Sequence, residues 1–353
     1  MSAISQLQKY FEGKRLFIPI AIGVGEAFYF FYHDFDIEAY RAITWKPAIL
    51  VWFLMALLMV VFRYLGYVVR LRILSDKVLT WKECLQLVGL WEFSSAISPG
   101  IVGGTAAAFI LLAQEKKLDT GKSTAIVLAT SYLDVLFYVL AVPLFLAFTG
   151  ILDLIPLNVG PIGKNGMLYY FLGAYGLLLA WAVFIYIGLF RHPKWISTAV
   201  INLFKLGFLR RWKGNAKEWG DEIIISAIEY KSKSRKYWFA AFGATVFSWT
   251  ARFVLVNMLI LAFGNGLEFL EIFSKQLIMW GALLIPFTPG ASGLAELLFP
   301  AFLGEYFANG QLANSTSVLW RIISYYPYLF LGFIIFPVWI KRIIKDRRST
   351  TEV

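Results

Sequence analysis

Two apolar stretches of the sequence are interrupted by short motifs that could bind an anion. One reads SPGIVGG from Ser98 and the other TPGASGLAE from Thr288, so both share Ser/Thr-Pro-Gly-x-x-Gly, 190 residues apart. A helix that starts after Pro-Gly leaves its first N–H groups without backbone partners and presents its positive dipole end, which favours phosphate or carboxylate. We expect the following motif residues to bind substrate, with the hydroxyls as helix caps: Ser98, Gly100, Gly103, Thr288, Gly290 and Gly293.

Three arginines within apolar stretches could add positive charge to the same site: Arg63, Arg252 and Arg321. Arg63 precedes Pro99 by 36 residues and Arg252 precedes Pro289 by 37, so the two occupy matching places relative to the motifs. We predict that these arginines bind the substrate anion. For Arg63 an alternative is that its long side chain reaches the membrane surface, since it lies seven residues from Arg70.

Four acidic residues also lie in apolar stretches: Glu26, Glu92, Asp134 and Glu296. A charge inside a membrane is costly unless it has a partner, so each acid could form a static ion pair with an arginine. Each could equally carry a coupling proton, and the sequence leaves both readings open. Glu296 follows the second motif directly and could also contact the substrate.

Composition excludes most soluble and enzymatic classes. Of 353 residues, 59% are hydrophobic and 16% are charged, the balance of a polytopic membrane protein. Cys84 is the single cysteine and His33 and His192 are the two histidines, so ligands for a metal site or a histidine-assisted nucleophile are scarce. The sequence also lacks the phosphate-loop, serine-hydrolase, zinc-protease and dithiol motifs. We therefore expect no enzyme activity, no cofactor and no metal.

The apolar segments that must position these residues fall into two kinds. Segments of the first kind are long enough to cross about 30 Å of hydrocarbon; they are roughly 16–32, 47–69, 122–149, 166–190, 237–263 and 315–340. The second kind, 83–113 and 272–304, is divided by Pro-Gly into halves too short to span. We predict an all-α polytopic membrane protein with six full spans and two re-entrant helical hairpins whose tips enclose a polar cavity. The aromatic group SYYPYLF from Ser324 is assigned to the membrane interface.

Basic residues are unequally distributed over the loops of this arrangement. The outer loops hold Arg41, Lys46, Lys164 and Lys275, whereas most other Lys and Arg residues fall on the opposite side. The positive-inside rule then predicts a multi-pass protein of a bacterial-type inner membrane with both termini in the cytoplasm. The hairpin 83–113 enters from the cytoplasm and 272–304 from outside. The basic loop 191–236 is predicted to lie on anionic inner-leaflet lipids. Topology thus explains the net charge of +11, and we expect no nucleic-acid partner.

The order of segments repeats within the chain. Residues 1–150 contain two spans, the hairpin 83–113 and a span; residues 151–353 contain a span, the loop 191–236, a span, the hairpin 272–304, a span and a basic tail. The charge distribution makes the two units run through the membrane in opposite directions. Such inverted-topology repeats are typical of carriers that work by alternating access.

The motif pair, with FRYLGYVVRLRIL upstream and LWRIISYYPYLFLG downstream, resembles the transmembrane region of lysylphosphatidylglycerol synthase/flippases. It also resembles stand-alone flippase-like proteins of that superfamily, over roughly 10–345. This resemblance implies translocation of anionic or aminoacylated phospholipids, or of related lipid-linked substrates. The chain ends at Val353 without the soluble synthase domain, so synthesis is not implied. Ala291 replaces a glycine of the family pattern Pro-Gly-Gly-x-Gly-x-x-Glu, and the first motif has Ala106 in place of the glutamate.

We therefore expect a lipid transporter that passes a headgroup through the cavity between the hairpins. Its partners would be the phospholipid substrate and anionic inner-leaflet lipids, and the sequence permits an oligomer. One alternative is a membrane enzyme or subunit that modifies a lipid carrier, although the chain offers no convincing set of acid, nucleophile and metal ligands. Another is a carrier of small anions.

Overall fold

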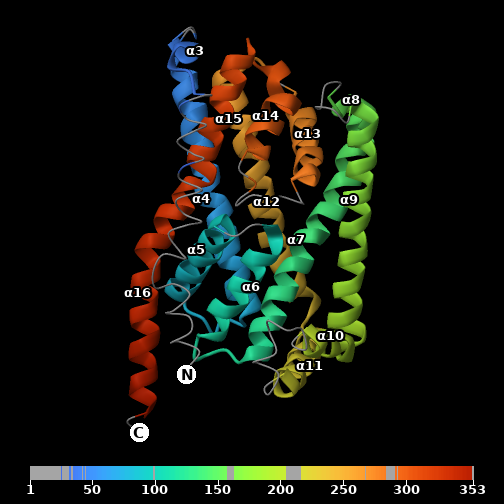
Figure 1. Cartoon of the computed structure of the whole chain (residues 1–353), viewed down its shortest axis with the longest axis vertical. Coiled ribbons are helices and arrows are strands. Elements are labelled where there is room, and N and C mark those ends of the chain that lie inside the picture. Colours follow the sequence, from blue (N-terminus) through green and yellow to red (C-terminus); the bar gives the residue numbers. More distant parts are fainter. Residues whose placement is uncertain are drawn as a thin grey trace.

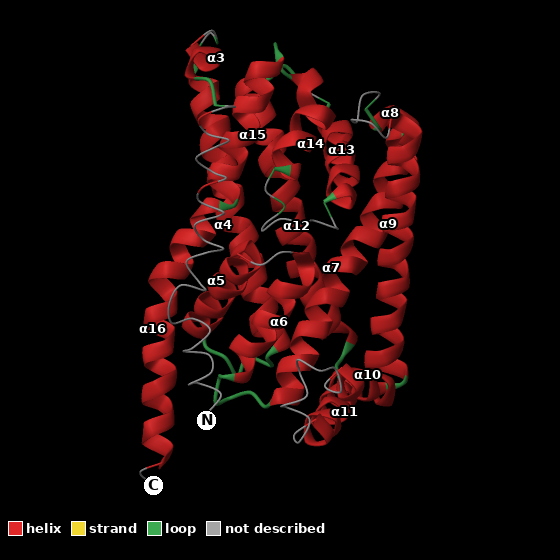
Figure 2. Ribbon diagram, in the orientation of Figure 1, coloured by secondary structure: helices red, strands yellow, loops and turns green. Residues whose placement is uncertain are grey.

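The part of the chain that the structure describes consists of helices joined by loops. This computed structural model describes residues 35–41, 43, 45–97, 100–156, 163–203, 216–266, 268–283, 291 and 293–351, with Gly25 and Tyr32, and these ranges contain no strand (Figure 2). The helices are α3 (Ile37–Arg41), α4 (Pro47–Leu74), α5 (Trp81–Ile97), α6 (Gly100–Ala113), α7 (Thr120–Thr149), α8 (Ile151–Leu154), α9 (Gly163–Tyr186), the π-helix η2 (Ile187–Arg191), α10 (Pro193–Leu203), α11 (Ala216–Ser232), α12 (Arg235–Phe263), α13 (Phe269–Ala282), α14 (Leu294–Leu303), the 3-10 turn η4 (Gly304–Tyr306), α15 (Gly310–Ser324) and α16 (Tyr326–Thr351).

Five helical segments are long and apolar enough to cross a membrane: Pro47–Leu74, Thr120–Thr149, Gly163–Arg191, Arg235–Phe263 and Gly310–Lys345. They match five of the predicted spans, and the predicted span 16–32 lies outside the described residues. The last segment differs from the prediction because it is broken between α15 and α16 at Tyr325, whose backbone leaves the helical conformation (φ −121°, ψ −54°). This break was not predicted.

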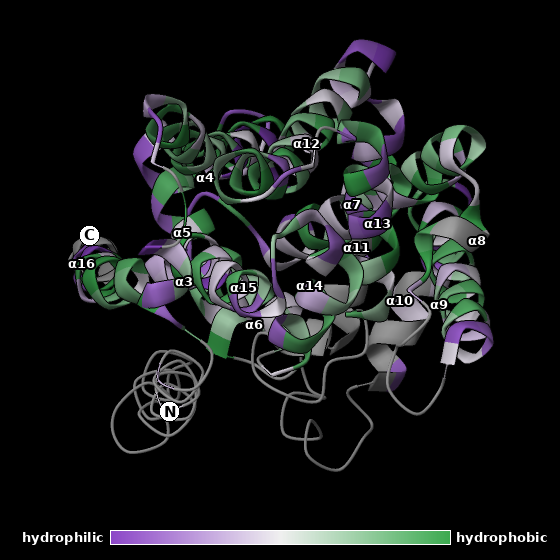
Figure 3. Ribbon diagram, turned by 90° about the horizontal axis from the view of Figure 1, so that it is seen from above, coloured by the Kyte–Doolittle hydropathy of each residue, from purple (hydrophilic) through white to green (hydrophobic). Residues whose placement is uncertain are grey.

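The helices α4 and α12 pack closely against each other. They lie side by side and run in opposite directions (Figures 1 and 3). Gly66 allows this approach, because a Cβ atom at that position would lie 2.1 Å from the hydroxyl oxygen of Ser248. The same hydroxyl donates to the carbonyl of Arg63 at 3.1 Å. At the edges of the molecule, α9 and α16 lie on opposite flanks (Figure 3).

Two pairs of short helices occupy opposite halves of the molecule. The pair α5 and α6 lies in the half that contains α11, and the pair α13 and α14 lies in the half that contains α3 and α8 (Figure 1). Gly104 lets α6 approach α5 closely, since a Cβ atom there would lie 2.3 Å from the Ser95 hydroxyl. Helix α5 ends at Ile97 and α6 begins at Gly100, while α13 ends at Ala282 and α14 begins at Leu294. In the sequence, the two Ser/Thr-Pro-Gly motifs fall where one helix of each pair ends and the next begins.

Two buried apolar clusters divide the molecule along its length. One includes Phe253 and Phe299 and joins α13, α14 and α15 to α12. The other includes Leu74 and Ile126 and joins α5 and α6 to α4, α7 and α11. Each short helix pair therefore has an apolar core of its own half to pack against.

Ion pairs connect α11 to α7 and to the loop after α4, at the end of the molecule where α10 and α11 lie (Figure 1). Lys122, in the first turn of α7, contacts Asp76 at 2.5 Å and Glu229 of α11 at 2.8 Å. Lys233 contacts the same two acids, each at 2.8 Å. Burial raises the pKa of the Glu229 carboxyl, but hydrogen bonds from Lys122 and Lys233 outweigh it and lower the pKa to about 2.

This cluster predicts a loss of stability in acid. Because folding lowers the pKa of Glu229, its carboxylate adds stability that is fully present above its ordinary pKa of 4.5 and is lost as the pH falls toward 2. We expect the melting temperature of the detergent-solubilised protein, followed by tryptophan fluorescence, to fall over this interval. Glu229→Gln should melt lower at pH 7 and show a smaller fall in acid. An equal acid dependence in both proteins would contradict the assignment.

Candidate functional site

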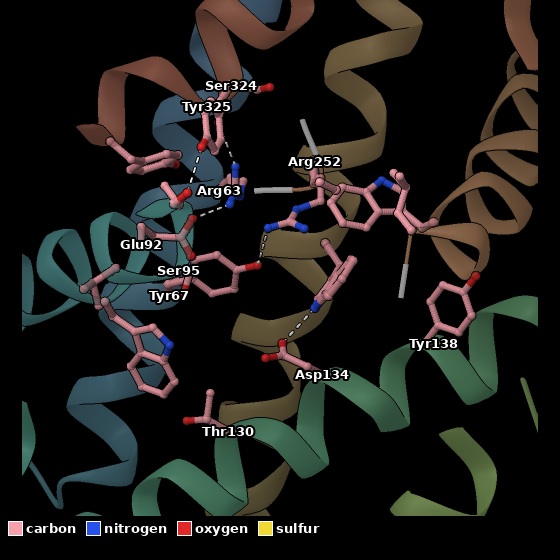
Figure 4. Close-up of a pocket in the computed structure, with 18 of the residues that line it drawn as sticks. Arg63, Tyr67, Glu92, Ser95, Thr130, Asp134, Tyr138, Arg252, Ser324 and Tyr325 are labelled. Atoms are coloured by element: carbon pink, nitrogen blue, oxygen red, sulfur yellow. Dashed lines mark hydrogen bonds and ion pairs between the residues drawn. The ribbon is translucent and has the colours of Figure 1, made fainter. Parts of the chain in front are cut away.

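A cavity of about 430 Å³ lies in the interior, where the middle sections of the long helices meet (Figure 4). Side chains from α4, α5, α6, α7, α9, α12, α13, α14, α15 and α16 line it. Four arginines lie on its wall: Arg63, Arg70, Arg252 and Arg321. Three of these, Arg63, Arg252 and Arg321, are the arginines predicted from the sequence, and the fold brings them to the same cavity.

Arg63 of α4 pairs with Glu92 of α5 and also donates to the backbone carbonyl of Ser324. Its guanidinium donates to Glu92 Oε2, and its Nη1 donates to the carbonyl of Ser324 at 3.3 Å (Figure 4). Ser324 is the last residue of α15, so Arg63 supplies a donor at the helix break. On the same stretch, the Tyr325 hydroxyl donates to the carbonyl of Ala96 at 2.8 Å, next to the first motif. Arg63 therefore lies in the cavity rather than at the membrane surface.

Asp134 of α7 pairs with Arg70, which we did not predict as a site residue. Arg70 Nη1 and Nη2 lie 2.5 and 3.2 Å from the two oxygens of Asp134, a bidentate arrangement. The Trp249 indole donates to the same carboxylate at 2.7 Å (Figure 4). Arg70 is seven residues after Arg63 and so lies on the same helical face, a spacing that could have identified it.

Glu296 of α14 pairs with Arg321 of α15 and caps its own helix. Its Oε1 accepts from Arg321 Nε at 3.0 Å, and its Oε2 accepts from the Gly293 backbone N–H at 2.8 Å. Gly293 is the N-cap with φ +84°, a conformation that favours glycine. The predicted residues Gly293 and Glu296 thus act together at the start of α14.

Arg252 of α12 differs from the other three arginines because no carboxylate pairs with it among the described residues. Its guanidinium carbon lies 4.6 Å from the ring centroids of both Trp249 and Trp280. Its Nη2 donates to the Tyr67 hydroxyl at 3.3 Å, and its Nε is buried without a partner in the described part of the chain (Figure 4). The aromatic side chains hold the cation but do not neutralise it.

The remaining predicted residues fall into two groups. Gly100 and Gly103 lie in α6, with Gly100 as its first residue. Outside the described residues lie Ser98, Thr288, Gly290 and Glu26. Ala291, which replaces a glycine of the family pattern, lines the cavity with φ +56°, the left-handed region that disfavours a Cβ atom.

The prediction that all aromatic residues of SYYPYLF lie at the membrane interface is wrong for two of them. Tyr325 and Tyr328 are buried and line the cavity. Tyr325 lies at the break between α15 and α16 and Tyr328 lies in the first turn of α16, so the break brings both side chains to the cavity. Phe330 of the same group is exposed.

The described residues contain no group of three or more His, Cys, Asp and Glu side chains that could hold a metal ion. The polar groups that line the cavity are guanidinium, carboxylate, hydroxyl and indole groups. Guanidinium groups bind phosphate and carboxylate through planar, paired hydrogen bonds. The arrangement is therefore suited to binding an anion.

Comparisons with known proteins identify similar membrane proteins. A sequence model described as "Lysylphosphatidylglycerol synthase TM region" matches residues 16–332. A "UPF0104 membrane protein" of Archaeoglobus fulgidus is 25% identical over 304 residues, which cover 82% of this chain and 88% of the relative. No solved structure matches. The chain belongs to the family of the lysylphosphatidylglycerol synthase transmembrane region, and it is a multi-pass membrane protein.

The contribution of the Arg321–Glu296 pair to the stability of the protein can be tested by removing one or both charges. Arg321→Met leaves a buried carboxylate without its cation, so we expect the free energy of unfolding to fall by about 3–5 kcal/mol. The double variant Arg321→Met/Glu296→Gln should recover most of this loss because it removes both charges. Unfolding in mixed detergent micelles would measure both. Arg41→Gln is the control, since it breaks an exposed pair with Glu38 and should cost less than about 1 kcal/mol.

Proposed function

We propose that this member of the lysylphosphatidylglycerol synthase transmembrane family is a lipid transporter. In this proposal the cavity binds the anionic or aminoacylated headgroup of a phospholipid, or of a related lipid-linked substrate, and moves it across the membrane. The single observation that carries the proposal is Arg252, a cavity arginine without a carboxylate partner among the described residues. An unneutralised cation within a membrane protein marks a substrate pathway more often than a structural site.

The volume of the cavity and its opening beside α9 favour the headgroup of a lipid as the ligand, rather than a whole soluble molecule. A volume of about 430 Å³ lies at the lower end of the range for small-molecule sites, roughly 300–1,000 Å³. This volume suits a headgroup without its acyl chains. Trp181 of α9 lines the cavity and is also 46% exposed, so the cavity reaches the outer surface beside α9. The acyl chains could stay in the bilayer along that edge.

An inverted repeat is part of the proposal. In support, α4 and α12 run in opposite directions, and they carry the matching arginines Arg63 and Arg252. The pairs α5–α6 and α13–α14 lie in opposite halves, and each pair is separated in the sequence by one of the two Pro-Gly motifs. We propose that they are re-entrant hairpins in units 1–150 and 151–353 and that the units alternate in exposing the cavity to the two sides.

The proposed orientation in a bacterial-type inner membrane follows from the charge distribution. The end with α10 and α11 holds Arg191, Lys194, Lys231 and Lys233, whereas the opposite end holds few basic residues, among them Arg41 and Lys164. Lys and Arg are retained on the cytoplasmic side, so we place α10, α11 and both termini there. The basic surface of this end would contact anionic inner-leaflet lipids.

Transport is tested with purified protein in liposomes. A fluorescent phosphatidylglycerol or lysylphosphatidylglycerol placed in one leaflet should become accessible to an external quencher faster with the protein than without it. Arg63→Ala/Arg252→Ala should reduce this rate by at least about tenfold, since charge-assisted hydrogen bonds to the phosphate are lost. The control Arg41→Gln should keep the wild-type rate. Unchanged transport by the double variant would show that the binding assignment is wrong.

Orientation is tested by cysteine labelling. In a Cys84→Ala background, Ser232→Cys at the end of α11 and Gln311→Cys at the start of α15 are exposed positions at opposite ends. We expect a membrane-impermeant maleimide to label Gln311→Cys in intact cells and Ser232→Cys only after the membrane is opened. The reverse pattern would invert the proposed topology.

A further inference from the structure

The four arginines that line the cavity and the three carboxylates paired with them, Glu92, Asp134 and Glu296, carry one net positive formal charge. From this we infer that the headgroup the protein transports is a monoanionic phosphodiester, such as that of phosphatidylglycerol, and not an aminoacylated headgroup. The inference rests on the proposed lipid transport and narrows its substrate class.

Three of the four cavity arginines are each matched by one carboxylate. Arg63, Arg70 and Arg321 pair with acids on neighbouring helices, which leaves Arg252 as the excess charge. The undescribed residues 98–99, 284–290 and 292 contain no ionisable side chain in the sequence. Glu26 lies outside the described residues and is not part of this count.

The surroundings of Arg252 make its charge available to one anionic group. Trp249 and Trp280 flank the guanidinium, so little water can reach it from those sides. Its Nη2 donates to the Tyr67 hydroxyl, and its Nε has no partner in the described residues. In such surroundings a charge interacts more strongly than in water, so a phosphodiester with a single negative charge would complete the balance.

An aminoacyl group would lack a carboxylate of its own in this cavity. Asp134 already binds Arg70 through both oxygens and also accepts from the Trp249 indole. Glu296 binds Arg321 and the N–H group of Gly293. Glu92 is neutralised by Arg63. The added ammonium groups of a lysyl headgroup would therefore lie among guanidinium groups that they repel.

The test compares three lipids in the same liposome assay: phosphatidylglycerol with one net negative charge, zwitterionic phosphatidylethanolamine, and lysylphosphatidylglycerol with one net positive charge. For the wild type we expect phosphatidylglycerol to move at least about tenfold faster than lysylphosphatidylglycerol, which corresponds to about 1.4 kcal/mol. Arg252→Gln removes the excess charge and should slow phosphatidylglycerol by a similar factor, so that the preference disappears. Arg41→Gln removes an exposed charge at one end of the molecule and should leave both rate and preference unchanged.

The possible failures are distinguishable. If the wild type moves lysylphosphatidylglycerol as fast as phosphatidylglycerol or faster, the inference is overturned while lipid transport stands. If Arg252→Gln keeps the wild-type preference, the excess charge does not select the headgroup and the inference is likewise overturned. If folded protein, verified by its melting transition, moves none of the three lipids, the proposed function fails and the inference fails with it.

Discussion

The neutralisation of buried arginines is the constraint on which the arrangement of the helices depends. A guanidinium remains charged in a protein, and an unpaired charge in a membrane interior costs several kcal/mol. Arg63 joins α4 to α5, Arg70 joins α4 to α7, and Arg321 joins α15 to α14. Each ion pair therefore crosses between helices and helps to determine which of them are neighbours.

Broken helices impose a second constraint, because their free backbone groups need partners where lipid offers none. At the break after α15, the Ser324 carbonyl accepts from Arg63. The Tyr325 hydroxyl reaches the Ala96 carbonyl near the end of α5, and the Gly293 N–H donates to Glu296 at the start of α14. Arg63 and Tyr325, which line the cavity, and Glu296, which pairs with the cavity residue Arg321, thus provide hydrogen-bond partners for the backbone at the helix ends.

Arg252 is the exception that connects this architecture to the proposed activity. The protein surrounds its guanidinium with Trp249, Trp280 and Tyr67 instead of a carboxylate. Aromatic faces stabilise a cation partially and leave its hydrogen-bonding groups able to exchange partners. A transporter needs such a site because a ligand held too tightly cannot leave, and an already neutralised arginine would not bind it.

The sequence by itself determined the membrane class, the two interruptions, the arginines within apolar stretches and six predicted spans, of which the described residues contain five. These features are local, because span length follows from consecutive apolar residues and Pro-Gly disfavours a continuous helix through its local backbone geometry. Only the tertiary structure decided which acid pairs with which arginine, that Arg70 belongs to the cavity, and that the last span is broken at Tyr325. These outcomes depend on contacts between residues far apart in the chain, such as Arg63 with Ser324, 261 residues away. Apolar periodicity carries no information about such partners, because a paired arginine and an unpaired one look alike in the sequence.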